Sequence, residues 1–136
     1  MTAQDLCLGY IVDYENVPYI VDSVISENEI EISAIDHAWG KESAHIIELN
    51  GIEITQPFLL ANGFIKKDDG MFEYVFALSY DIETGILKSV STDERYPKKI
   101  TCIHELQRAF WEIGQKRKKF IFKKEFYKGN IKKLVE

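Results

Sequence analysis

The sequence of 136 residues lacks the features of secreted, metal-stapled and membrane proteins. It has only two cysteines, Cys7 and Cys102, which stand far apart and outside any CxxC or Cys/His ligand spacing, so we expect buried thiols rather than a disulfide framework. No stretch approaches the ~20 apolar residues that a membrane-spanning helix requires. The start of the chain also lacks the basic region and apolar run of a signal peptide. We therefore expect a cytoplasmic protein with no membrane partner.

The motifs of enzymes and nucleotide-binding proteins are missing as well. The eight glycines form neither a GxGxxG nor a GxxxxGK[ST] loop, which excludes phosphate binding by those routes. The three histidines have no metal-ligand spacing. The acidic pair Asp68-Asp69 falls in an expected turn, where such pairs are usually solvated. The sequence therefore predicts no catalytic residue, no metal ligand and no cofactor.

Period-two alternation of apolar and polar residues predicts short antiparallel strands in two parts of the chain. The first set comprises residues 9–14, 18–26, 29–35, 43–49 and 51–55, with Asn50-Gly51 as a hairpin turn. The second set comprises residues 64–67, 71–80 and 86–91, with Asp69-Gly70 as a tight turn. Residues 91–99 are mostly polar, and we expect them to form a loop.

A short helix is expected between the two sets of strands. It spans about residues 56–62, begins after Thr55 as the N-cap, carries Pro57 in its first turn and ends at Gly63. A longer helix is expected further along the chain. We predict that residues 1–114 form a single domain, with this helix near its end. The fold class is therefore α+β, with antiparallel meanders and an N-terminal part like a small barrel.

The longer helix, about residues 101–113, has apolar side chains at three- and four-residue spacing, with Thr101 as its expected cap and Gly114 as its expected end. It carries His104, two positions after Cys102. Positions two apart on a helix point to different sides, so we expect this pair not to act as nucleophile and base. His104 is expected to be a structural histidine that hydrogen-bonds nearby backbone and holds the helix on the sheet.

Charge is distributed unevenly along the chain. Residues 116–136 contain nine Lys/Arg and two Glu, a balance of +7, and because the whole chain carries −5, residues 1–115 carry −12. We call residues 115–136 the basic tail, and we expect it to pack on the same domain as an aromatic extension. A strongly acidic region is a poor partner for phosphate backbones, so any nucleic-acid contact is expected in this tail.

The basic tail alternates positive and aromatic side chains, and two interpretations of it are open. The cations can pair with phosphates while the rings stack on bases. Alternatively, the rings pack on the core, or the tail folds against the acidic surface of the chain. The candidate contacts to a nucleic acid or a partner are Lys116, Arg117, Lys118, Lys119, Phe120, Phe122, Lys123, Lys124 and Tyr127.

Two segments carry a resemblance to a known family. IEITQPFLLANGF (52–64) resembles an I-x-[IL]-T-x(3)-L-x(3)-GF segment, and residues 100–111, with IHELQ and FW, resemble an [IV]-H-x-LQ-x(2)-[YF]-[YFW] helix. Together with the opening strands, they resemble a family of small proteins from Bacteroidetes genomes and their phages. The resemblance covers most of residues 8–114 and implies a bacterial or phage-infected host cell as the setting. The N-terminal strands also resemble a small Src-homology-type barrel.

Three functions follow as hypotheses. The first is a non-enzymatic binding or accessory protein of phage or mobile-element type that recognises a macromolecular partner, with a protein as the first candidate, as a monomer or a homo-oligomer. The second is a nucleic-acid-binding module that acts through the basic tail, with an affinity that falls steeply with salt. The third is an enzyme centred on His104, which requires carboxylates to converge with it in one pocket.

Overall fold

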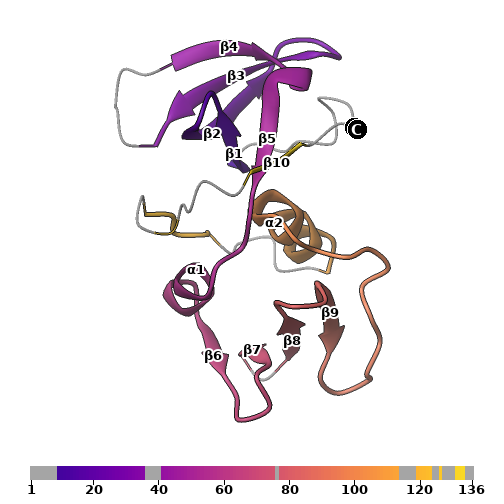
Figure 1. Cartoon of the computed structure of the whole chain (residues 1–136). Coiled ribbons are helices and arrows are strands. Elements are labelled where there is room, and N and C mark those ends of the chain that lie inside the picture. Colours follow the sequence, from indigo (N-terminus) through magenta and orange to yellow (C-terminus); the bar gives the residue numbers. More distant parts are fainter. Residues whose placement is uncertain are drawn as a thin grey trace.

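A computed structural model describes residues 9–35, 41–75, 77–113, 119–123, 126 and 131–133, and it has an α+β fold with two antiparallel sheets and two α-helices (Figure 1). The six-stranded sheet has the order β10-β5-β1-β2-β3-β4, and the four-stranded sheet has the order β6-β7-β8-β9. The predicted fold class is confirmed. The elements are β1 (Ile11–Tyr14), β2 (Val17–Val24), β3 (Glu29–Ala34), β4 (Lys41–His45), η2 (Ile46–Glu48), β5 (Leu49–Ile52), α1 (Gln56–Ala61), β6 (Phe64–Lys66), β7 (Phe72–Tyr74), β8 (Leu78–Asp81), β9 (Ile86–Ser89), α2 (Ile103–Glu112) and β10 (Ile131–Lys133).

The N-terminal strands form a meander and one returning strand. β1, β2, β3 and β4 form a meander, and β5 then returns to pair with the outer side of β1. A single 3₁₀ turn, η2, connects β4 to β5.

The predicted hairpin turn at Asn50-Gly51 is wrong, because both residues lie inside β5. The chain reverses earlier, at η2, where His45 Nδ1 accepts a hydrogen bond from Ile47 N (3.2 Å) and Glu48 Oε1 accepts one from His45 N (3.0 Å). Gly51 has a packing role instead. A Cβ at this position would lie 2.6 Å from Cys102 Sγ, so only glycine allows the start of α2 to approach the strand this closely.

The second meander also differs from the prediction in one strand. Residues 71–80, expected to be continuous, form the two short strands β7 and β8, because the chain turns at Val75 with φ +49°. Tyr74 therefore faces Leu78 across a hairpin. The tight turn at Asp69-Gly70 is confirmed, with Gly70 at φ +86°.

Both helices lie close to their predicted positions. Thr55 caps α1 as expected, since its Oγ1 accepts a hydrogen bond from Phe58 N (3.4 Å), and Gly63 has the expected positive φ of +90°. At α2 the predicted cap is wrong, because Cys102 and not Thr101 occupies the N-cap position. Gly114, the expected end of α2, lies outside the described residues.

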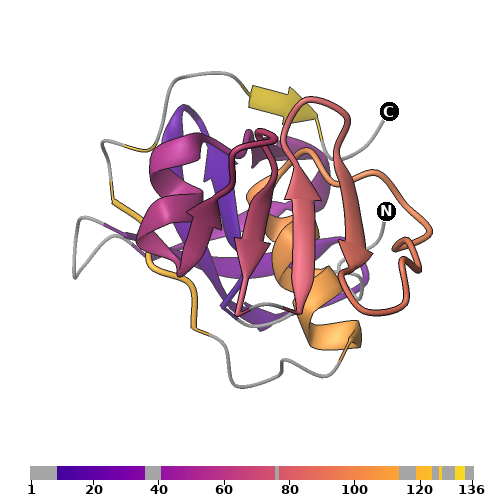
Figure 2. The ribbon, with the colours of Figure 1, turned by 90° about the horizontal axis from the view of Figure 1, so that it is seen from below.

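The α2 helix lies between the two sheets (Figure 1), and Figure 2 shows the four-stranded sheet in front of it. Two groups of buried side chains result. The barrel core lies within the six-stranded sheet and comprises Tyr10, Val12, Tyr14, Tyr19, Val21, Ile30, Ile32, Ala34, Ala44, Ile46 and Leu49. The aromatic core lies around α2 and comprises Ile11, Ile52, Ile54, Phe58, Leu59, Phe64, Phe72, Tyr80, Leu87, Ile100, Ile103, Leu106, Ala109, Phe110 and Phe126.

Candidate functional site

Residues 94–100 form a strap along the outer edge of β9, and two pockets open beside it. Backbone hydrogen bonds join Ser89 N to Glu94 O (2.8 Å) and Tyr96 N to Leu87 O (2.7 Å). The strap ends where Ile100 N donates to Gly85 O (2.8 Å). This segment was expected to be only a polar loop. Its backbone bonds instead hold Tyr96 in place between β9 and α2.

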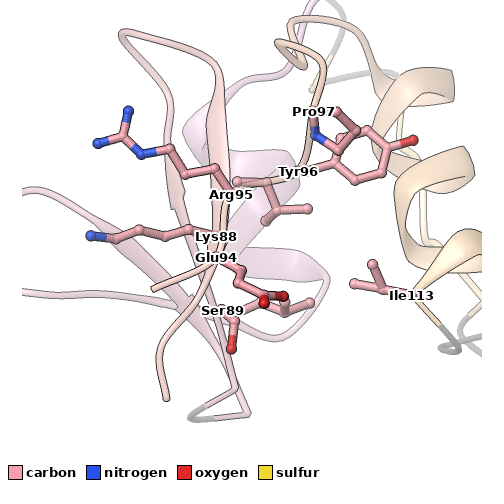
Figure 3. A pocket seen from close by; sticks show the side chains of 9 residues that line it. Lys88, Ser89, Glu94, Arg95, Tyr96, Pro97 and Ile113 are labelled. Atoms are coloured by element: carbon pink, nitrogen blue, oxygen red, sulfur yellow. The ribbon is translucent and has the colours of Figure 1, made fainter. Parts of the chain in front are cut away.

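The larger pocket is an apolar groove of about 200 Å³, which we call the Tyr96 groove. Its walls come from three parts of the chain: strands β8 and β9, the strap, and the C-terminal end of α2. Figure 3 shows Tyr96 and Pro97 on one side and Ile113 on another. The lining residues are Leu78, Leu87, Lys88, Ser89, Glu94, Arg95, Tyr96, Pro97 and Ile113.

Charged side chains are distributed unevenly around the Tyr96 groove. In Figure 3 the head groups of Lys88 and Arg95 extend together away from Ile113, whereas the carboxylate of Glu94 lies on the side of Ile113. The ammonium of Lys88 also forms an ion pair with Asp93 (Nζ to Oδ1, 3.0 Å). The charge that faces the groove is therefore the negative charge of Glu94.

The smaller pocket, on the other side of Tyr96, has a volume of about 70 Å³, and we call it the His104 pocket. The strap supplies one wall, and the first two turns of α2 supply the other. His104 and Arg108 stand four positions apart on α2 and so share one face of it. The lining residues are Tyr96, Lys98, Lys99, Ile100, His104, Glu105 and Arg108.

His104 is buried, with 4% of its surface exposed, and its Nδ1 has no hydrogen-bond partner within the described part of the chain. The predicted bond to nearby backbone is therefore not made by this nitrogen. Burial lowers the pKa of His104 to about 4, against the opposing effect of the Glu105 carboxylate. The imidazole is consequently neutral at pH 7, and one of its nitrogens has no hydrogen-bond partner among the residues that the structure describes.

Cys102 and His104 pack against the same residue, which corrects the expectation that their side chains point to different sides. A Cβ at Gly51 would lie 2.6 Å from Cys102 Sγ and 3.0 Å from His104 Cε1. The helical geometry behind that expectation does not apply, because Cys102 is the N-cap and has an extended backbone (φ −116°, ψ 154°). Cys102 is buried, however, and does not line the His104 pocket.

Carboxylates near the His104 pocket are occupied by protein donors. Glu105 Oε1 accepts hydrogen bonds from the backbone N of Thr101 (3.0 Å) and of Cys102 (2.9 Å), which satisfies the start of α2. Glu112 accepts from Arg108 Nε (2.9 Å) and from Tyr96 Oη (2.8 Å). These bonds, the one from Arg108 first, hold the pKa of Glu112 below its usual value.

The basic tail, where it is described, packs its aromatic side chains inward. Phe120 stacks on Phe58 with ring centroids 5.9 Å apart and meets Phe110 edge-on at 5.2 Å. Phe126 is buried against Phe58 (6.3 Å), and Phe122 lies edge-on to Phe126 (6.1 Å). These rings contact the aromatic core, as the second interpretation of the tail expects.

A buried asparagine attaches the tail to α1. Asn62 Nδ2 donates to Ile121 O (2.8 Å) and Phe58 O (2.8 Å), and its Oδ1 accepts from Ile121 N (2.5 Å). Lys119 and Lys123 are exposed. Nucleic-acid contact by these two lysines stays a prediction, and the other proposed contacts, Lys116, Arg117, Lys118, Lys124 and Tyr127, lie outside the described residues, as does Cys7.

Comparison with protein-family models, curated proteins and solved structures finds no match to this chain. Within the described residues no helix has the length and apolar character needed to cross a membrane. No group of three or more His, Cys, Asp and Glu side chains that could hold a metal ion occurs there either.

Sequence reasoning missed both pockets. The residues of the Tyr96 groove lie between positions 78 and 113, and no spacing in the sequence connects them. The one local signal was the pair Tyr96-Pro97 within an otherwise polar segment. His104 was singled out, but the basic strap residues Lys98 and Lys99 beside it were not.

Proposed function

We propose that this protein is a binding protein that recognises a partner protein through the Tyr96 groove. The observation that carries the proposal is the groove itself: an apolar cleft of about 200 Å³ between β9, the strap and the end of α2. Ile113 at its wall is 42% exposed, and Val90, directly after the lining residue Ser89, is 44% exposed. Apolar side chains gathered around a concave site are typical of surfaces that bind other proteins.

The charge of the groove indicates the kind of partner. Glu94 supplies a negative charge on the side of Ile113, and residues 1–115 as a whole carry −12. A partner segment with an apolar side chain next to a Lys or Arg complements both features, since the apolar group fills the cleft and the cation faces Glu94. We take such a segment as the ligand.

The resemblance to small proteins of Bacteroidetes and their phages suggests where this partner is found. An accessory protein of a phage or mobile element acts on a protein of its host or of the virus. The proposal therefore includes a macromolecular partner from that setting, and it needs no catalytic step.

Selection of a random peptide library on the purified protein tests the proposal. We expect enriched peptides to contain an apolar residue beside Lys or Arg, and we expect Ile113→Glu to weaken their binding by at least about tenfold. Ile65→Glu is the matched control, because Ile65 is equally apolar and exposed but lies on β6, outside the groove. No enrichment, or enriched peptides that bind the Ile113 variant as tightly as wild type, would overturn the proposal.

Glu94→Lys tests the charge part of the proposal separately. We expect it to weaken peptides that carry the basic residue and to leave peptides with a neutral residue there unchanged. The difference between the effects on basic and on neutral peptides should shrink as the salt concentration rises, because an exposed ion pair is screened. An equal loss for both peptides would show that Glu94 acts through the shape of the groove and not through its charge.

A further inference from the structure

The strap adds a further edge to the four-stranded sheet, directly beside the Tyr96 groove. An isolated antiparallel bridge pairs Arg95 of the strap with Lys88 of β9. The hydrogen bonds on either side of this bridge are made by the neighbours of Arg95, through Glu94 O and Tyr96 N. In an antiparallel pair, only alternate residues direct their N–H and C=O toward the neighbouring strand. The backbone N and O of Arg95 therefore point away from β9.

This outward edge at Arg95 is open within the part of the chain that is described. Arg95 is exposed, and no hydrogen bond among the described residues uses its backbone N or O. Unpaired N–H and C=O groups at a sheet edge are a template for a further strand. The edge is short, because Pro97 has no N–H and stands two positions later. The strap therefore offers one backbone donor and one acceptor at Arg95.

The side chains of the strap alternate between two faces of this edge. Glu94 and Tyr96 line the groove and stand two positions apart, as residues on one face of a strand do. Arg95 stands between them, and in Figure 3 its head group extends away from Ile113. One face of the edge is therefore negative and apolar, and the other carries the positive charge of Arg95.

We propose that the partner segment binds the strap as an added antiparallel β-strand, with one of its residues paired with Arg95. This inference rests on the proposed function and specifies the conformation of the partner. Antiparallel pairing continues the pattern of every strand pair in this sheet. The residue paired with Arg95 shares its face, and the two flanking residues lie on the face of Glu94 and Tyr96.

The charges of the strap then define the sequence of the partner. The residue opposite Tyr96 comes first and should be apolar, because it lies at the groove. The residue paired with Arg95 should be acidic, and the residue opposite Glu94 should be Lys or Arg. The expected order from the N-terminus is apolar, acidic, basic. The apolar and basic residues that the groove calls for then lie side by side on one face, two positions apart.

An extended partner fits this edge better than a helical one. A helix satisfies its backbone groups internally and would leave the N–H and C=O of Arg95 without a partner. In a helix, an apolar and a basic residue on one face stand three or four positions apart, whereas in a strand they stand two apart. The spacing in selected peptides therefore distinguishes the two conformations.

A scan of N-methylated peptides tests the proposal on the full chain, with the tightest peptide that selection yields. N-methylation removes one backbone donor and keeps the side chain. We expect binding to weaken by at least about tenfold when the acidic residue is methylated, because its N–H donates to Arg95 O. Methylation of either flanking residue should change binding by less than about twofold, because those N–H groups point away from the strap.

The scan separates this inference from the proposed function. If the peptides bind and depend on Ile113, but methylation has no effect or an equal effect at all three positions, the added strand is wrong and the groove remains the binding site. If selection yields no binding peptide, the proposed function and the added strand are both wrong. Amide exchange at Arg95 gives a second readout, and it should slow when the peptide is added because its N–H becomes bonded.

Arg95→Glu tests the pairing of side chains across the edge. It should weaken a peptide with the acidic central residue by about fivefold and strengthen the same peptide with Lys at that position. Lys98→Glu is the matched control, because it makes the same charge change at an exposed strap residue that does not line the groove. Equal effects of the two variants, or unchanged amide exchange at Arg95, would overturn the proposal.

Discussion

The barrel core and the aromatic core are built in opposite ways. Every residue of the barrel core lies between positions 10 and 49, in or directly beside strands that pair with their neighbours in sequence or through one return strand. The aromatic core draws on residues from Ile11 to Phe126, including both helices and the basic tail. The barrel core needs only local alternation and turns, whereas the aromatic core forms only when distant segments meet. Both pockets lie beside the aromatic core.

β1 is the strand that joins the two cores. Its side chains alternate, with Ile11 in the aromatic core and Val12 in the barrel core, so both faces of the strand are covered. This explains why all four of its residues are buried, including the acidic Asp13. We therefore expect the two halves to unfold together, and the following experiments test how far they depend on each other.

The largest effect is expected for Phe110→Ala in the aromatic core. Phe110 is 1% exposed and contacts the rings of Phe64, Tyr74 and Phe120, so its truncation should lower the free energy of unfolding by about 3–5 kcal/mol. Urea unfolding followed by circular dichroism measures the loss. If amide exchange then shows β2 and β3 still protected while α2 exchanges freely, the two cores are independent and the expected cooperativity is wrong.

The next effect is a pH dependence that comes from His104. In the unfolded chain this imidazole takes up a proton near pH 6.5, but in the folded protein it does so only near pH 4, because burial disfavours the charged form. The unfolded state thus binds more protons in this window, and stability falls as the pH falls from about 6.5 to 4, by roughly 3 kcal/mol. Urea unfolding at several pH values measures the slope.

His104→Gln is the control for this pH dependence, because glutamine does not titrate. The variant should lose much less stability between pH 6.5 and 4. Glu112 acts in a separate window: its lowered pKa contributes stability above its usual value of 4.5, and this is lost as the pH falls below it. If the free energy of unfolding changes equally with pH in wild type and in the His104→Gln variant, the pH dependence does not come from His104.

Gly51→Ala tests the contact between β5 and the start of α2. The added Cβ would lie 2.6 Å from Cys102 Sγ and 2.9 Å from Cys102 Cβ, so we expect the free energy of unfolding to fall by about 1–3 kcal/mol. Cys102→Ala removes the sulfur, and the double variant should regain part of the loss in a double-mutant cycle. Strict additivity of the two substitutions would show that the clash is not the cause.

Asn62→Ala tests the attachment of the basic tail to the aromatic core. It leaves Ile121 N and O without their side-chain partner. We therefore expect the free energy of unfolding to fall by about 1–2 kcal/mol and amide exchange at Ile121 to become faster. Asn50→Ala is a matched control, because the Asn50 amide makes a longer bond, of 3.5 Å, to Asp13. Unchanged exchange at Ile121 would mean that the ring contacts alone hold the tail.

The smallest effect is expected for Glu112→Gln at the surface. Exposed ion pairs contribute little, so the free energy of unfolding should change by about 0.5 kcal/mol or less. The sharper readout is Tyr96, whose pKa is raised to about 12 by burial and then by its hydrogen bond to Glu112. Ultraviolet titration of the tyrosines should show the pKa of Tyr96 moving down in the variant, and an unchanged value would argue against the bond.

Predictions from sequence succeeded where a few neighbouring residues decide the backbone. Thr55 and Gly63 mark the ends of α1 through a cap bond and a positive φ, and Asp69-Gly70 forms its turn for the same local reason. The apolar spacing of α2 also predicted its extent to within about two residues at its start. Each of these signals depends only on residues that are close together in the sequence.

The clearest failure has a physical cause in contact between distant residues. Asn50-Gly51 has the composition of a turn, but pairing with β1 and β10 places it inside a strand, against which Cys102 packs closely. Val75 has high strand propensity, yet the chain reverses there. At Asn50-Gly51 tertiary packing overrides a weaker local preference, whereas no contact in the structure explains the reversal at the exposed Val75.

The sequence by itself determined the α+β class, the alternation that makes two meanders, and the positions of both helices, because these depend on periodicity and capping within short segments. The tertiary structure alone decided that Tyr96 stands between two pockets, that Cys102 and His104 converge on Gly51, and that the rings of the basic tail face the core. Each of these arises from side chains tens of residues apart. Their meeting is set by the packing of whole elements, which no local pattern encodes.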